Sequence, residues 1–104
     1  MSKFAHTQGI TKVNFTKTVT VFCPLGNDYY TAHVTVEFTP DCVMMDYLDM
    51  EKFFKEKIQG NKLIIEDVVD NVYKHIKEEY APSYLKVTVF AENATHFPVT
   101  VEKE

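Results

Sequence analysis

The stretch Phe22-Cys23-Pro24-Leu25-Gly26-Asn27-Asp28-Tyr29-Tyr30 separates two runs that are rich in β-forming residues. Before it, from Val13 to Val21, the apolar residues fall on odd positions with threonine mostly between them. After it, valine and phenylalanine alternate with polar residues as far as Thr39. A period of two predicts strands with one buried face, and proline, glycine, asparagine and aspartate favour turns. The stretch therefore predicts a long antiparallel hairpin with a thiol and a carboxylate at its tip.

From Tyr47 the spacing of apolar residues changes to that of a helix. We predict a first helix from Tyr47 to about Ile58, with one buried stripe and charged residues facing away. Asp46 or Asp49 could cap its start, and Gly60-Asn61 is a plausible stop.

A second helix is predicted from Glu66 to Tyr80, with acids near its start and lysines nearer its end. Two further strands are predicted at Leu85–Val89 and Phe97–Val101. The order β-β-α-α-β-β favours an α+β fold, in which a four-stranded antiparallel sheet carries both helices on one face. Its open edges need protection, and pairing between subunits into an oligomeric barrel is one solution.

The bulk properties of the chain narrow the class of protein. We interpret residues 1–10 as a flexible arm and residues 11–104 as a single domain. No signal peptide or membrane span is recognisable, so we expect a cytoplasmic protein without a membrane partner. The net charge of −4 argues mildly against a nucleic-acid partner. Neither Cys23 nor Cys42 belongs to a Cys-x-x-Cys pair, so free thiols without a zinc site are expected.

The order of elements and several segments together resemble the tunnelling fold, and within it the QueF nitrile reductases and the QueF-like archaeosine synthases. The segments that carry the resemblance are Cys23-Pro24-Leu25 with Asp28-Tyr29-Tyr30, Val34 to Asp41, Ile65-Glu66-Asp67, and Ala81 to Val87. The resemblance covers about Thr18 to Val101. It implies an oligomeric barrel with sites between subunits.

The resemblance also implies a chemistry. In that family a cysteine attacks the nitrile of 7-cyano-7-deazaguanine and forms a thioimide, an aspartate moves protons, and a glutamate holds the purine-like edge. Cys23, Asp28 and Glu66 stand at the matching positions. QueF-like enzymes then use ammonia to make an amidine on the base within tRNA, whereas the reductases use NADPH. We expect the amidine-forming reaction, with no cofactor and no metal, on the free or the tRNA-linked base.

Several residues depart from the reductase pattern. The gap between Cys23 and Asp28 is two residues shorter, and Ile65 replaces a histidine. The window Asp46-Tyr47-Leu48-Asp49-Met50 contains two acids and lacks the lysine that serves NADPH in reductases. The segment Met44 to Lys52 is also similar to pyruvoyl-tetrahydropterin synthases, but the hairpin carries only His33 where those zinc enzymes have three histidines.

Each candidate also has an ordinary structural interpretation. A lone cysteine after a strand is usually a small buried hydrophobe, and an acid in the first turn of a helix suits the helix dipole. Glu92 is a second candidate for the purine anchor, and Tyr30 and Phe97 could stack on a flat ring. A nitrile reductase, a non-catalytic purine or pterin binder and a ligand-free structural subunit therefore remain alternatives.

Overall fold

The computed structural model describes residues 7–92 and 97–104. In these residues the elements are β1 (Val13–Cys23), β2 (Asp28–Thr39), α1 (Tyr47–Phe53), the π-helix η1 (Phe54–Ile58), α2 (Ile65–Tyr80), β3 (Tyr84–Ala91) and β4 (Val99–Lys103). Residues 1–6 of the predicted arm lie outside the described residues.

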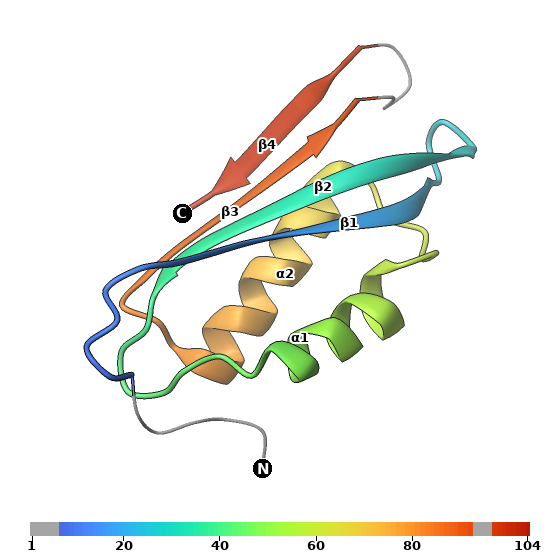
Figure 1. Ribbon diagram of the computed structural model, residues 1–104. Helices are drawn as coiled ribbons and strands as arrows, with labels where there is room; N and C mark the ends of the chain where they lie inside the picture. Colours follow the sequence, from blue (N-terminus) through green and yellow to red (C-terminus); the bar gives the residue numbers. More distant parts are fainter. Residues whose placement is uncertain (1–6, 93–96) are drawn as a thin grey trace.

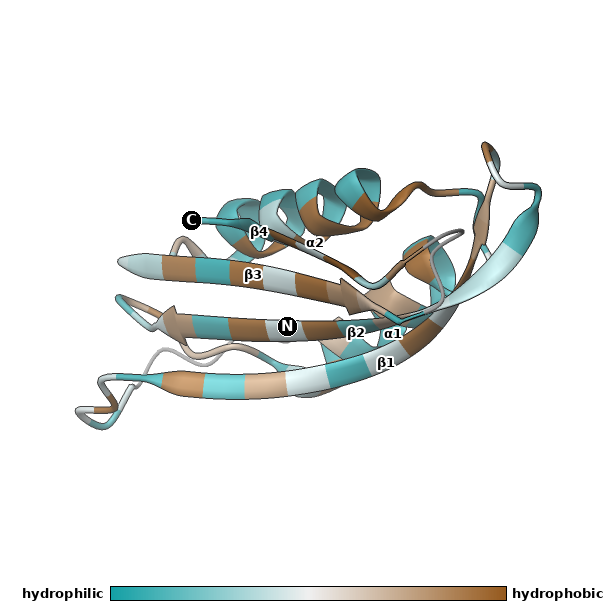
Figure 2. Cartoon of the chain, turned by 90° about the horizontal axis from the view of Figure 1, so that it is seen from above, coloured by the Kyte–Doolittle hydropathy of each residue, from teal (hydrophilic) through white to brown (hydrophobic). Residues whose placement is uncertain are grey.

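The four strands form one antiparallel sheet in the order β1-β2-β3-β4, and both helices cover the same face of it (Figure 1). This confirms the predicted α+β architecture. Hydrophobic and polar residues alternate along the strands, as Figure 2 shows. The hydrophobic set faces the helices, because side chains along a strand point to opposite faces in turn.

The core lies between the sheet and the helices. It is built from the inward residues of the strands and from one stripe of each helix, and its largest fully buried side chains include Phe38, Met45, Phe54, Ile58 and Ile76. In the described part of the chain, no helix combines the length and apolarity that a membrane crossing requires.

Asp46 is the residue that caps α1. Its carboxylate accepts hydrogen bonds from the amides of Leu48 at 2.9 Å and Asp49 at 3.2 Å. The second half of the predicted first helix winds differently from expectation, since the amide of Gln59 bonds the carbonyl of Phe54 at 2.8 Å across five residues. Phe54 and Ile58 are four residues apart, so they lie on the same face of this segment, and both are buried in the core.

The second helix ends as the sequence predicts, at Ala81 in the left-handed conformation (φ 43°) just before Pro82. The last strand begins at Val99 rather than at Phe97 and continues to Lys103. Its register against β3 explains the shift, because Ala91, the last residue of β3, pairs with Val99.

Candidate functional site

One end of the molecule gathers the predicted site. The tip of the β1–β2 hairpin, the connection from η1 to α2, the end of β3 and the start of β4 all lie there (Figure 1). These are the places where Cys23, Asp28, Glu66, Glu92 and Phe97 occur.

Cys23 and Asp28 are register partners, the last residue of β1 and the first of β2. Cys23 continues the inward set of Val19 and Val21, is half-buried, and packs against the core. Directly opposed residues of an antiparallel pair have Cβ atoms about 5 Å apart on the same face of the sheet. The side chains of Cys23 and Asp28 therefore start from neighbouring positions on the face of the sheet that carries the helices.

The turn between them is shaped by the residues that the sequence singled out. The amide of Asn27 donates to the carbonyl of Cys23 at 2.8 Å, and Asn27 takes a left-handed conformation with φ of 55°. Asparagine tolerates that conformation better than most residues. The amide of Gly26 lies 3.4 Å from Sγ of Cys23 and donates to it, while one carboxylate oxygen of Asp28 accepts from the amide of Tyr29 at 2.7 Å. Asp28 is exposed, so its carboxylate is open to a ligand.

The segment 59–63 binds the outer edge of β1 just before Cys23. The amide of Gly60 donates to the carbonyl of Thr20 at 2.8 Å. The amide of Phe22 donates to Asn61 at 3.0 Å, and the amide of Leu63 donates back to Phe22 at 3.0 Å. Because α2 begins two residues after Leu63, this pairing brings the start of α2 beside the hairpin tip.

Tyr30 connects the hairpin to the segment before α2 through a hydrogen bond made by its buried side chain. Its side chain is 4% exposed, and its hydroxyl donates to the carbonyl of Leu63 at 2.6 Å. Burial raises the pKa of Tyr30 above its ordinary value, and the carboxylates of Asp67 and Glu66 are among the groups that raise it further. The hydrogen bond from Tyr30 to Leu63 therefore joins the hairpin that carries Cys23 and Asp28 to the segment that leads into Glu66.

Glu92 is directed elsewhere. One of its carboxylate oxygens lies 3.6 Å from Nε2 of His33, and the His33 ring stacks on Phe90. His33 alternates with the inward residues Ala32 and Val34, so this cluster lies on the sheet face opposite the helices. Within one protomer Glu92 is thus separated from Cys23 by the sheet. Phe97 is 66% exposed and lies two residues before β4.

A groove on the surface, formed by α1, η1 and α2, lies away from the predicted site residues. It occupies about 450 Å³ between α1, η1 and α2, and its lining, drawn from the described residues, contains none of the predicted site residues. It is lined by Asp49, Lys52, Phe53, Glu56, Lys57, Asn71, Lys74, His75 and Glu78.

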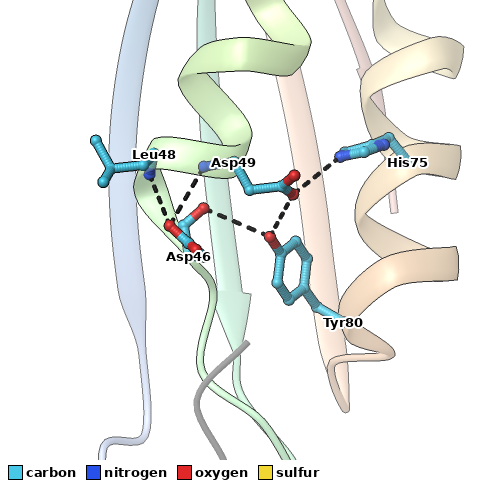
Figure 3. Close-up of polar contacts among 5 residues, drawn as sticks. All are labelled: Asp46, Leu48, Asp49, His75 and Tyr80. Carbon is cyan, nitrogen blue, oxygen red and sulfur yellow. Dashed lines mark hydrogen bonds and ion pairs between the residues drawn. The ribbon is translucent and has the colours of Figure 1, made fainter. Parts of the chain in front are cut away.

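Beside that groove, a second polar cluster holds α1 against α2 (Figure 3). The hydroxyl of Tyr80 donates to Oδ2 of Asp49 at 2.6 Å, and Nε2 of His75 lies 3.5 Å from the same oxygen. Burial, and then the carboxylate of Asp49, raise the pKa of Tyr80. The carboxylates of Asp46 and Asp49 thus both form hydrogen bonds within the fold.

The sequence did not mark Asp67 or the carbonyl of Leu63 as part of the candidate site. Asp67 stands next to Glu66 in the first turn of α2, where an acid is expected for the helix dipole alone. Leu63 contributes only backbone atoms, which no residue pattern marks. Within residues 7–92 and 97–104, no three His, Cys, Asp or Glu side chains gather in an arrangement that could hold a metal ion.

Comparison with known proteins gives one kind of match. No protein-family model matches the sequence, and no curated protein matches it. Among solved structures, the chain is similar to the archaeosine synthase QueF-Like in its apo form, with a TM-score of 0.83 and 20% sequence identity. The match covers 92% of this chain and 94% of that one. The chain therefore has the predicted tunnelling fold, which it shares with the archaeosine synthase QueF-Like.

Proposed function

We propose that this protein converts the nitrile of a 7-cyano-7-deazaguanine into an amidine, with Cys23 as the nucleophile. The observation that carries the proposal is the pairing of Cys23 with Asp28 at the hairpin tip, in a fold shared with an archaeosine synthase. A half-buried thiol beside an exposed carboxylate suits covalent catalysis with proton transfer. The accessible Glu66 at the start of α2 adds a group that could orient the ring.

The first step is addition of the thiol across the C≡N bond. Sγ of Cys23 bonds to the nitrile carbon while its proton passes through the carboxylate of Asp28 to the nitrile nitrogen. The product is a thioimide, and no electrons are gained or lost. A nearby carboxylate does not itself favour the thiolate, so Asp28 acts here as a proton carrier rather than as an activator of the thiol.

In the second step ammonia attacks the thioimide carbon. The tetrahedral adduct collapses with cleavage of the C–S bond, and the sulfur recovers a proton, again through Asp28. The free thiol is restored, and the carbon keeps two nitrogens as an amidine. No reductant is consumed, which agrees with the acidic window at Asp46 and Asp49.

Glu66 would hold the ring. Its carboxylate can accept two hydrogen bonds, one from the ring N–H and one from the exocyclic amine of a guanine-like edge. Such a pair fixes orientation as well as affinity, and correct orientation of the nitrile toward Sγ is what the addition needs.

A second copy of the chain would complete the pocket. Leu25, Tyr29 and Phe97 are large apolar side chains that are 83%, 58% and 66% exposed at the site end. We propose that residues 11–104 act as one domain in a cytoplasmic homo-oligomer with sites between subunits. In it Glu92 and Phe97 would reach a neighbouring site. The base within tRNA and the free base are the two candidate substrates.

The test is mass spectrometry of the reduced, full-length protein after incubation with 7-cyano-7-deazaguanine. The wild type should gain the mass of the ligand, and Cys23→Ala should not. Cys42→Ala is the matched control, because Cys42 is the second free cysteine and lies outside the site. It should form the adduct like the wild type.

Further outcomes distinguish the alternatives. Adding ammonium to the adduct should release the amidine and regenerate the thiol. Absence of an adduct from reduced wild-type protein would sink the covalent mechanism. Ligand binding that survives Cys23→Ala without any adduct would instead favour a non-catalytic purine or pterin binder, and consumption of NADPH would favour the reductase.

A further inference from the structure

The ring of Tyr30 is buried, unlike that of an aromatic residue that stacks on a ligand. It stands opposite Val21 in the hairpin, on the same face as Asp28, and its ring is packed in the core. With 4% of the residue exposed, the ring offers almost no surface to a bound base. What it places near the site is its hydroxyl, which ends at the carbonyl of Leu63.

Leu63 is the point where the hairpin and α2 meet. Its amide donates to the carbonyl of Phe22, the residue before Cys23, and its carbonyl accepts from Tyr30. Both strands of the hairpin therefore hold one residue, and Glu66 follows it by three positions. Any shift of Leu63 changes the position of Glu66 relative to the thiol.

The Leu63 carbonyl can only accept, so the hydroxyl of Tyr30 is the donor in this hydrogen bond. Burial, followed by the carboxylates of Asp67 and Glu66, raises the pKa of the hydroxyl and so keeps it protonated. As a neutral donor to the Leu63 carbonyl, the phenol holds this segment in place without adding a charge. A charged side chain at position 30 would change this hydrogen bond and would also add a charge.

We propose that Tyr30 is a positioning residue, which through the Leu63 carbonyl sets the separation between the nucleophile Cys23 and the ring-holding Glu66. The inference rests on the proposed function and reassigns Tyr30 from a stacking surface to a tether. Loss of the hydroxyl should loosen the start of α2 while leaving Cys23 in its strand. A ring held at the wrong distance reacts slowly even when it is bound, since a misplacement of about 1 Å can cost as much as a hundredfold.

The experiment compares Tyr30→Phe with Tyr80→Phe in the adduct reaction. Tyr80 is the matched control, since it is 3% exposed and also donates a hydrogen bond of 2.6 Å, but at the other end of α2. For Tyr30→Phe the maximal rate of adduct formation should fall by about tenfold, and the half-saturating ligand concentration should rise. The intrinsic reaction of Cys23 with iodoacetamide should stay unchanged. Tyr80→Phe should leave all three quantities near those of the wild type.

Restoring a donor provides a rescue that a purely structural role would not explain. With p-aminophenylalanine at position 30, an N–H replaces the O–H, and the maximal rate should recover most of the loss. Equal rates for Tyr30→Phe and Tyr80→Phe, with the wild type forming the adduct, would overturn this inference alone. No adduct from the wild type would overturn the proposed function and this inference with it.

Hydrogen exchange keeps the inference testable even if Tyr30→Phe does not fold. In the wild-type protein the amide of Leu63, which donates to Phe22, should exchange as slowly as the amides in the middle of α2. Rapid exchange at Leu63 in the wild type would overturn the tether, because a segment that opens freely cannot set a distance.

Discussion

The two ends of α2 use the same device for different purposes. At each end a buried tyrosine donates a hydrogen bond of 2.6 Å across elements that are distant in sequence, Tyr30 to Leu63 and Tyr80 to Asp49. Burial raises the pKa of both tyrosines. The acceptors differ: a backbone carbonyl at the start of the helix and a carboxylate at its end.

The two ends of α2 differ in whether their acidic side chains form hydrogen bonds within the fold. At the end of α2, Asp46 caps α1 and Asp49 accepts from Tyr80, so both carboxylates are used internally. At the start of α2 the tyrosine donates to a carbonyl instead, and the side chain of Glu66 stays exposed at the end of the molecule that carries Cys23. Ionisable groups that the fold does not consume are the ones available for chemistry.

The largest effect should come from the core that both ends share. Ile76 is fully buried, and Ile76→Ala should lower the free energy of unfolding by about 2–5 kcal/mol, because it removes apolar contacts and leaves a cavity. Urea unfolding followed by circular dichroism measures the change. Leu48→Ala is the control at a side chain that is 83% exposed, and should change stability by no more than about 0.5 kcal/mol. Equal effects would mean that the helix is not anchored as described.

Removing the free charge at the start of α2 should come next. Glu66→Gln should raise the half-saturating concentration of 7-cyano-7-deazaguanine by about ten- to a hundredfold, the value of a charge-assisted hydrogen bond. The concentration dependence of adduct formation reports it. Glu78→Gln makes the same change in the last turn of the helix and should have no effect. A similar loss in both variants would remove the functional distinction between the two ends.

Alkaline pH should reduce the stability that the protonated Tyr30 and Tyr80 contribute at the two ends of α2. The pKa of Tyr30 and that of Tyr80 lie above 10.0 in the folded protein, so the folded state holds these protons more tightly than the unfolded state. The resulting stability is complete below pH 10 and is lost as the pH rises above it. Thermal unfolding across this range measures the loss. The double variant Tyr30→Phe/Tyr80→Phe should show a shallower decline, with a remainder from Tyr47 and Tyr84, whose pKa values are also raised. An unchanged slope would contradict the assignment.

The smallest effect is expected from a substitution at Asp70, which lies between the two ends of α2. Asp70 lies in the first half of α2 and accepts hydrogen bonds from Lys103 at 2.8 Å and Lys74 at 2.9 Å, which lower its pKa. Exposed ion pairs contribute little, so Asp70→Asn should change the rate of adduct formation by no more than about twofold. Any stabilisation should fade with added salt and as the pH falls toward the pKa of Asp70. A large loss of activity would mean that the site extends along the helix.

Much of the architecture was predictable because local patterns encode it. The alternation before and after Cys23 specifies a hairpin with one buried face, and Asn27 suits the left-handed turn that it adopts. The π-turn of η1 was not predictable, because the four-residue spacing of the buried Phe54 and Ile58 fits an ordinary α-helix equally well. Likewise the start of β4 depends on its register with β3 rather than on its own residues.

By itself the sequence determined the strands, the helices, and the adjacency of Cys23 and Asp28 across a tight turn, because these follow from contacts between residues that are near in the chain. Only the tertiary structure decided that Tyr30 turns inward to Leu63 and that Glu92 lies on the far face of the sheet. Tyr30 and Leu63 are 33 residues apart, and no local pattern fixes which donor meets which acceptor over that separation. That choice is made when the helices close over the sheet and each buried polar group must find a partner.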